Sequence, residues 1–191
     1  LKESMTPKKF CSLLQANFSF EPTESQKLWF PAISDFIFSV KPNTVFLLKG
    51  YAGTGKTTLI SSLVKDIWNT GFKIILMAPT GRAAKVMTAY SNTPAKTIHK
   101  QIYYPKAEKS GKMSFKLKPN KYKKTLFVID EASMIGDDRQ NAKLFENGSL
   151  LNDVVQYVSQ GDNCKLLLVG DQAQLPPINL DLSPALDKEE L

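Results

Sequence analysis

The sequence predicts an α/β fold: a doubly wound parallel sheet with a small inserted β-hairpin. Three observations predict it. Four short apolar, β-prone runs alternate with helical stretches along the chain. A glycine-rich turn stands between the first of these runs and a helix, and one lysine-rich segment interrupts the alternation. With 191 residues, the chain is long enough for one such domain with an insertion.

The segment before the sheet is predicted to be helical. Thr6 and Pro7 indicate the start of a short helix, because threonine caps helices and proline is favoured in their first turn. A second helix over residues 23–40 contains Pro31, which we expect to kink it. We assign residues 1–22 to a helical lead-in, residues 23–100 and 125–184 to the sheet domain, and residues 101–124 to the insertion.

The four apolar runs are predicted to be strands of one sheet. They lie near residues 45–48, 73–77, 125–129 and 165–169. Their nearly continuous apolar character is typical of parallel strands that are buried on both faces. We therefore expect helices on both sides of the sheet.

The turn after the first strand has the spacing of a phosphate-binding loop (P-loop). Residues 50–58 fit G-x-x-x-x-G-K-[ST] at every fixed position, between a strand and a helix over residues 58–68. Glycines let the backbone curl around a phosphate, Lys56 suits the β- and γ-phosphates, and the Thr57 hydroxyl suits Mg²⁺. A plain glycine turn is the alternative. The candidate nucleotide-binding residues are Gly50, Ala52, Gly53, Thr54, Gly55, Lys56, Thr57 and Thr58.

Two later strands also end in polar side chains. Asp130 and Glu131 follow the third run, where Asp130 could hold Mg²⁺ and Glu131 could orient or deprotonate an attacking water. An acidic helix N-terminus would also explain this pair. After the fourth run, Asp171 is a candidate nucleotide-binding residue, and Gln174 is placed to reach the γ-phosphate. A strand followed by a proline-stiffened loop is the alternative there.

Two further segments suit the phosphates of a nucleic acid. Thr80, Arg82 and Lys85 lie at a helix start after the second strand, and Thr97 and His99 offer similar groups. A solvated helix start or a core histidine would explain each segment equally well. The net charge of +7 agrees with a polyanionic partner but is weak support by itself.

The insertion over residues 101–124 is rich in lysine and contains one acidic residue, Glu108. Residues 112–118 alternate polar and apolar side chains, and Ser110 and Gly111 indicate a turn before them. This pattern predicts a small, exposed, basic β-hairpin. The alternative to a role in DNA binding is a solvated hairpin whose charges protect a sheet edge.

Composition excludes several other classes of protein. The longest apolar runs are far short of a membrane span, and no N-terminal signal pattern is present. Cys11 and Cys164 lack metal-type spacing and indicate reduced thiols in a cytoplasmic protein. His99 is the single histidine, which rules out a multi-histidine metal site.

Five motifs together carry a family resemblance. GYAGTGKTT, APTGRAAK, TIHK, IDEASM and GDQAQLPP, in this order, resemble the N-terminal RecA-like motor domain of superfamily 1B DNA helicases. The most similar group is the RecD-like and Dda-like one, also called the exodeoxyribonuclease V alpha-subunit type. The resemblance implies an AAA-family P-loop ATPase that uses ATP and Mg²⁺, moves 5′→3′ along single-stranded DNA, and acts in DNA repair or recombination.

The resemblance also implies roles for individual residues. Gln26 resembles the glutamine that reads adenine, although Thr23-x-x-Gln26 also fits a capping box. The insertion sits where the family has its strand-separating pin. The resemblance makes Lys56, Glu131 and Gln174 catalytic, Thr57 and Asp130 metal-binding, and Thr80, Arg82, Thr97 and His99 DNA-binding.

The chain departs from the family pattern in one respect. The family needs a second RecA-like domain that brings arginines to the ATP site, and nothing after Pro177 resembles it. The chain has two arginines, Arg82 and Arg139. We expect an excised domain with little activity alone, a truncated linker over residues 185–191, and nuclease or recombination subunits as possible partners.

Two competing functions stay open. A small-molecule kinase would share the phosphate-binding loop, but it would need an arginine-rich lid that this chain lacks. A nucleotide-gated DNA-binding module without turnover is the non-enzyme alternative. Glu131 and Gln174 argue against that alternative.

Overall fold

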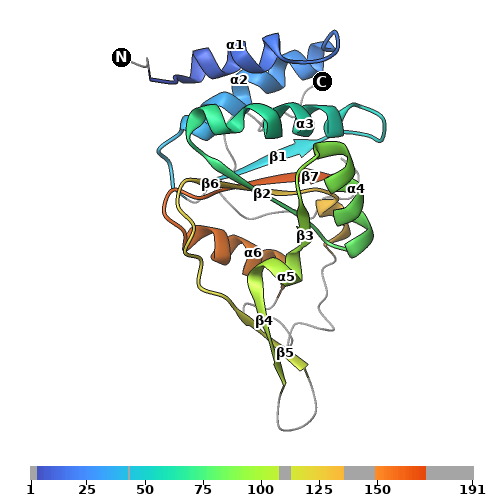
Figure 1. The fold of residues 1–191 in the computed structure, drawn as a ribbon, viewed down its shortest axis with the longest axis vertical. Coiled ribbons are helices and arrows are strands. Elements are labelled where there is room, and N and C mark those ends of the chain that lie inside the picture. Colours follow the sequence, from blue (N-terminus) through green and yellow to red (C-terminus); the bar gives the residue numbers. More distant parts are fainter. Residues whose placement is uncertain (1–3, 43, 108–112, 136–148, 171–191) are drawn as a thin grey trace.

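A five-stranded parallel sheet forms the centre of the computed structural model, which describes residues 4–42, 44–107, 113–135 and 149–170 (Figure 1). The strand order is β1-β7-β6-β2-β3, and all neighbouring strands are parallel. The strands are β1 (Val45–Lys49), β2 (Lys73–Ala78), β3 (Ala95–Thr97), β6 (Thr125–Ile129) and β7 (Lys165–Gly170). The predicted α/β fold with a parallel sheet is therefore confirmed.

The sequence did not predict β3. This strand has three residues, Ala95, Lys96 and Thr97, which form no apolar run, and none of them is fully buried. It forms because Ala95 to Thr97 pair with Leu76 to Ala78 of β2, which is a long-range contact. Short strands of this kind depend on their neighbour rather than on their own pattern.

Helices cover both faces of the sheet (Figure 1). On one side lie α1 (Pro7–Ala16), α2 (Glu24–Phe38) and α3 (Lys56–Asp66), which continues into the 3₁₀ helix η1 (Ile67–Thr70). On the other side lie α5 (Ile98–Ile102) and α6 (Leu150–Ser159), while α4 (Gly81–Ser91) lies beside β3. The Thr6 side chain caps α1, as expected, and α2 is one helix that runs through Pro31. No helix within these described ranges has the length and apolar character that a membrane crossing requires.

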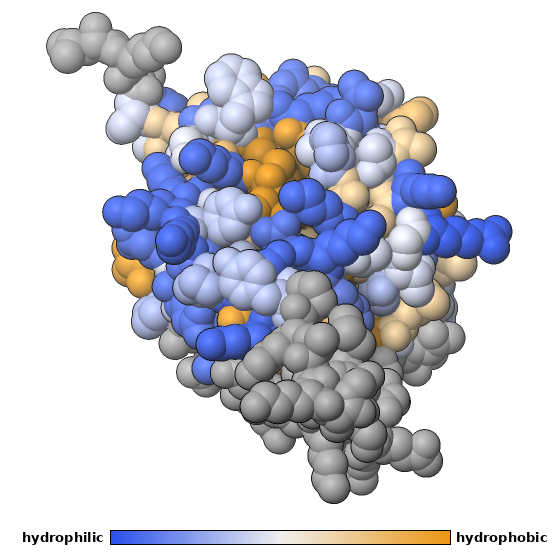
Figure 2. Space-filling model, turned by 60° about the horizontal axis from the view of Figure 1, so that its bottom comes forward, coloured by the Kyte–Doolittle hydropathy of each residue, from blue (hydrophilic) through white to orange (hydrophobic). Residues whose placement is uncertain are grey.

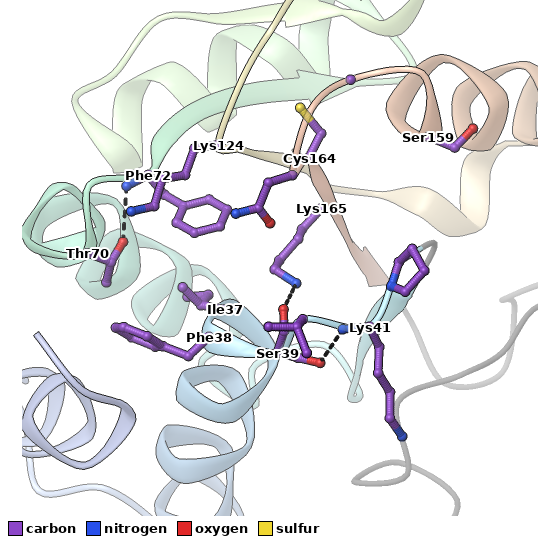
Figure 3. A pocket seen from close by; sticks show the side chains of 14 residues that line it. Ile37, Phe38, Ser39, Lys41, Thr70, Phe72, Lys124, Ser159, Cys164 and Lys165 are labelled. Carbon is purple, nitrogen blue, oxygen red and sulfur yellow. Dashed lines mark hydrogen bonds between the residues drawn. The ribbon is translucent and has the colours of Figure 1, made fainter.

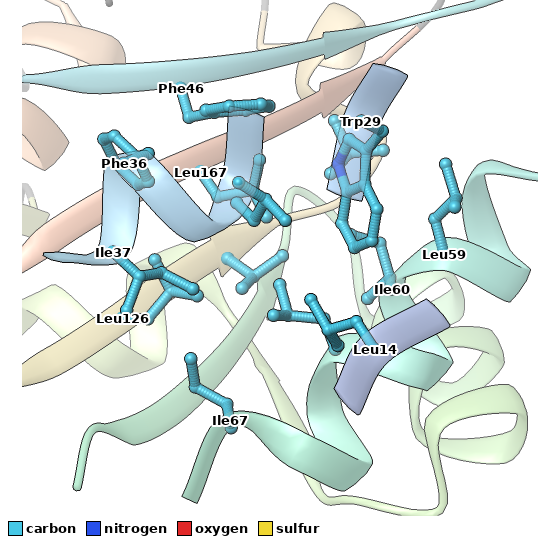
Figure 4. Packing of buried hydrophobic residues seen from close by; sticks show 14 of the residues in the cluster. Leu14, Trp29, Phe36, Ile37, Phe46, Leu59, Ile60, Ile67, Leu126 and Leu167 are labelled. Carbon is cyan, nitrogen blue, oxygen red and sulfur yellow. The ribbon is translucent and has the colours of Figure 1, made fainter. Parts of the chain in front are cut away.

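The sheet divides the core into two layers because alternate residues of each strand face opposite sides. Leu126 and Val128 of β6 pack in the layer beneath α1, α2 and α3, while Phe127 and Ile129 pack against α5 and α6. Figure 4 shows the first layer, where Trp29 and Ile60 lie between the helices and the sheet. Strands β6 and β7 are buried throughout, as their apolar runs predict.

The predicted hairpin is present and projects from one end of the molecule (Figure 1). It consists of β4 (Tyr103–Ala107) and β5 (Met113–Leu117), which pair antiparallel. Its base is buried rather than exposed: Tyr103 and Leu117 are 2% and 8% exposed. The Tyr103 hydroxyl also donates a 2.5 Å hydrogen bond to Asp153 of α6, which is fully buried. The hairpin is therefore fixed to the domain by its first and last residues.

Candidate functional site

The phosphate-binding loop and the two carboxylates lie at the same edge of the sheet. Parallel strands end at one edge, and the register places Lys49 of β1 beside Gly170 of β7, and Ile129 of β6 beside Leu168 of β7. Gly50 and Asp130 follow these strands directly. The carboxyl edge of an open α/β sheet is the usual position of ligand sites.

The backbone of the loop fits a phosphate. Gly53 and Gly55 have φ angles of 81° and 82°, a left-handed conformation that favours glycine. Gly55 is the N-cap of α3 and has no side chain to cap it, so among the described residues no side chain caps the first N–H groups of this helix. A Cβ on Gly50 would lie 2.7 Å from Oγ1 of Thr54. These features form a close-fitting loop with uncapped N–H groups, which suits an anion.

The Lys56 side chain folds back over this loop. Its Nζ donates hydrogen bonds to the carbonyl oxygens of Gly50 at 2.5 Å and Tyr51 at 2.8 Å. Thr57, the next residue, is exposed. Among the described residues these two neutral carbonyl groups are its hydrogen-bond partners, so a polyphosphate would compete well for it.

Gln26 braces the loop from α2. Its Oε1 accepts the N–H of Thr23 at 3.0 Å, which completes the capping box that the sequence left open. Its Nε2 donates to the carbonyl oxygen of Thr54 at 3.1 Å. The capping contact and the loop contact both exist in this structure, and the role in reading adenine stays a prediction.

Asp130 is anchored at both of its carboxylate oxygens. Oδ1 accepts the N–H of Glu131 at 2.9 Å, and Oδ2 accepts the hydroxyl of Tyr90 at 2.6 Å. Burial and the neighbouring carboxylate raise the pKa of Tyr90 above its ordinary value of 10.0, so this hydroxyl stays protonated and donates. Sequence reasoning missed Tyr90, because it lies 40 residues before Asp130 and belongs to no motif.

Glu131 is exposed and has a φ of 54°, which is unusual for a residue other than glycine. Such a conformation costs about 1–3 kcal/mol and occurs often at functional sites. At Glu131 the chain turns from the end of β6 into a short 3₁₀ helix, η2 (Ala132–Met134).

Thr80 and Thr97 both cap helices at this edge of the sheet. The Thr80 hydroxyl accepts the N–H of Ala83, and the Thr97 hydroxyl accepts the N–H of Lys100. The two segments are neighbours, because Thr97 pairs with Ala78, two residues before Thr80. Each hydroxyl keeps its own proton for donation to a further acceptor. Arg82 and Lys85 of α4 are exposed.

His99 lies at the base of the hairpin. Its ring centroid is 5.7 Å from that of Tyr103 and 5.3 Å from that of Phe115, and burial lowers its pKa below 6.5. A pocket of about 350 Å³ is lined by His99, Lys100, Tyr103, Tyr104, Phe115 and Lys118. Figure 2, which brings the hairpin end forward, shows a mostly hydrophilic face with a small hydrophobic area. Aromatic faces beside lysines suit an unstacked base and its phosphate.

A second pocket, of about 430 Å³, lies where the strands begin, at the opposite edge of the sheet (Figure 3). Its buried cation, Lys165, is 3% exposed and donates to the carbonyl oxygen of Ser39, the C-cap of α2, at 2.8 Å. Burial lowers the pKa of Lys165. Lysine side chains often bond the carbonyl groups at a helix C-terminus, as Lys165 does here. The pocket is separate from the candidate site because it lies at the opposite edge of the sheet.

The predicted site residues are thus partly brought together. The loop, Gln26, Asp130 and Glu131 share one edge with Thr80 and Thr97. Asp171, Gln174 and the predicted linker lie outside the described residues. In the part of the chain that the structure describes, no group of three His, Cys, Asp or Glu side chains could hold a metal ion. Thr57 and Asp130, the predicted Mg²⁺ ligands, both lie at this edge of the sheet, and their role as ligands stays a prediction.

Known proteins resemble this chain over most of its length. It is 32% identical to the ATP-dependent RecD2 DNA helicase of Deinococcus radiodurans over 139 residues, which cover 71% of this chain and 16% of that protein. It is 31% identical to the ATP-dependent DNA helicase dda of Enterobacteria phage T4 over 159 residues, which cover 82% of this chain and 33% of that protein. The chain therefore spans a third or less of the length of these relatives.

The fold is also found in a solved structure. The large terminase of bacteriophage HK97 matches 87% of this chain, and the chain covers 38% of the terminase, with a TM-score of 0.52. At 13% identity this likeness concerns the fold alone. The family model for the AAA domain matches residues 35–179, which include the phosphate-binding loop and both carboxylates. The chain belongs to the AAA domain family.

Proposed function

We propose that this chain is the first motor domain of an ATP-dependent DNA helicase that moves 5′→3′ along single-stranded DNA. The observation that carries the proposal is the shared edge of the sheet. A phosphate-binding loop, a carboxylate pair and two neighbouring threonines that cap helices lie there together. The ATP-dependent DNA helicases of D. radiodurans and phage T4, each about 30% identical, support the helicase part of the proposal.

The loop would bind the triphosphate of ATP. Its N–H groups and the N-terminus of α3 would surround the phosphates, and Lys56 would leave its two carbonyl partners to contact the β- and γ-phosphates. Gly50, Ala52, Gly53, Thr54, Gly55 and Thr58 complete this contact surface. Gln26 lies close to Gly55 and would orient the adenine.

Thr57 and Asp130 would hold Mg²⁺ between them. A bound Mg²⁺ supplies positive charge to the β- and γ-phosphate oxygens. Glu131 is exposed beside Asp130, and its carboxylate would orient the water that attacks the γ-phosphate. Asp171 and Gln174 follow β7 in the sequence, and we propose nucleotide-binding and γ-phosphate-sensing roles for them.

Single-stranded DNA would cross the face formed by α4, α5 and the hairpin. The hydroxyls of Thr80 and Thr97 would donate to phosphates, Arg82 and Lys85 would add charge, and His99 would contact a base. We further propose a second RecA-like domain, which would supply arginines to the ATP site, and nuclease or recombination subunits as partners. We also propose a role in DNA repair and a cytoplasmic location.

The test is ATP turnover with and without single-stranded DNA, in this chain and in the longer protein that we propose carries it. We expect DNA to stimulate turnover in the longer protein, and Glu131→Gln to abolish turnover while keeping Mg·ATP affinity. Glu24→Gln, an equivalent change on the exposed first turn of α2, is the matched control. Phosphate transfer to a small acceptor would instead support a kinase. Nucleotide-dependent DNA affinity without turnover would support a binding module.

A further inference from the structure

We propose that Tyr90 is a positioning residue that holds Asp130 in the orientation required for Mg²⁺, and so sets the magnesium dependence of nucleotide binding. The proposal rests on the proposed function, because it assigns Asp130 to the metal. Nothing in the motifs points to Tyr90, which is in the last turn of α4.

The hydroxyl of Tyr90 is dedicated to Asp130. The Tyr90 hydroxyl lies 2.6 Å from Oδ2 of Asp130, and within the described ranges it has no other hydrogen-bond partner. In the same ranges no cation forms an ion pair with Asp130. The half-buried carboxylate therefore depends on two donors, the Tyr90 hydroxyl and the N–H of Glu131. Two donors on different oxygens fix the rotation of the carboxylate plane.

The backbone of Tyr90 lies against α3, the helix that carries Thr57, the other proposed magnesium ligand. Oγ of Ser61 in α3 lies 3.0 Å from the carbonyl oxygen of Tyr90 and 2.8 Å from the carbonyl oxygen of Thr57. Its single proton serves one of these acceptors at a time. Tyr90 thus contacts Asp130 through its side chain and the first turns of α3 through its backbone. Through Ser61, Tyr90 therefore connects Asp130 with the helix that carries Thr57, the two residues that would share Mg²⁺.

The hydroxyl itself points to a role beyond packing. A phenylalanine would fill the same space without the cost of burying a polar group. Carboxylates that bind metals are commonly oriented by a second hydrogen bond, and removing that partner lowers metal affinity or activity by about 10–100-fold. Loss of the Tyr90 hydroxyl should therefore affect magnesium more than ATP.

The test compares Tyr90→Phe with the unmodified protein in equilibrium binding of a fluorescent ATP analogue, with excess Mg²⁺ and with a chelator. We expect affinity without Mg²⁺ to stay within about 2-fold. We expect the gain in affinity on adding Mg²⁺ to fall about 10-fold, and the Mg²⁺ concentration for half-saturation to rise about 10-fold. Tyr122→Phe is the matched control, because that hydroxyl accepts a hydrogen bond from Gln101, far from the loop. It should change neither quantity.

A second variant keeps the test decisive if Tyr90→Phe lowers stability. In an Asp130→Asn background, Tyr90→Phe should have no further effect on the Mg²⁺ titration. An unchanged titration in Tyr90→Phe alone would overturn the positioning role. So would an equal loss of affinity with and without Mg²⁺, which would mean a general structural effect. If the unmodified protein binds no nucleotide, the proposed function fails as well; if it binds normally and only the Tyr90 variants disagree, the proposed function stands.

Discussion

Replacing Gly55 with alanine should destabilise the protein by about 2–3 kcal/mol. Gly55 has a φ of 82°, where a Cβ costs about 1 kcal/mol. That Cβ would also lie 2.4 Å from Nε2 of Gln26, so the amide must move. Moving it breaks the 3.1 Å bond to Thr54 and disturbs the 3.0 Å bond from Thr23, each worth about 0.5–1.5 kcal/mol.

Gly53→Ala provides the matched control. Gly53 has nearly the same φ, 81°, but nothing lies within 4 Å of its added Cβ, so only the backbone strain of about 1 kcal/mol applies. The gain from a less flexible unfolded chain is common to both variants and cancels in the comparison. Thermal unfolding should separate the two by about 2–8 °C.

A Gln26→Ala background then isolates the contact. There, Gly55→Ala should cost no more than Gly53→Ala, because the amide that obstructs the Cβ is gone. Urea unfolding of the four single and double variants measures this difference. If Gly55→Ala costs the same in both backgrounds, Gln26 does not brace the loop and the reasoning fails.

Three further predictions concern ligands and pH. Lys56→Ala should weaken ATP binding by about 10- to 150-fold in calorimetry, whereas Lys49→Ala, an exposed neighbour, should leave it unchanged; equal affinities would contradict the role of Lys56. Replacing residues 104–116 with a short turn keeps the buried base of the hairpin, Tyr103 and Leu117. If the hairpin separates the strands of DNA, this change should reduce unwinding far more than DNA-stimulated ATP turnover. An equal loss of both activities, or of neither, would contradict the strand-separating role. Burial lowers the pKa of His99 below its ordinary value of 6.5. As the pH falls through 6.5, the unfolded chain therefore takes up a proton before the folded protein does, and the free energy of unfolding decreases. His99→Gln should lose less stability between pH 7.5 and 5.5, and an identical loss in urea unfolding would remove His99 as the cause.

Local patterns in the sequence were enough to predict the main elements of the fold and to select the residues of the candidate site. Apolar runs predicted β1, β2, β6 and β7, because strands buried on both faces leave a continuous local pattern. The glycine spacing predicted the loop, because only glycine adopts the left-handed conformation there without strain. Alternation and a turn signal predicted the hairpin. Each of these signals lies within about ten neighbouring residues.

Contacts between residues far apart in the chain became visible only in the folded structure. It set the strand order β1-β7-β6-β2-β3 and formed β3 on the edge of β2. It placed the Tyr90 hydroxyl on Asp130, 40 residues away, and the Tyr103 hydroxyl on Asp153, 50 residues away. It also gave Gln26 a second partner in the loop. The polar groups in these contacts show no periodic pattern in the sequence. Each hydrogen bond joins two elements whose relative position is fixed by core packing and not by their local sequence.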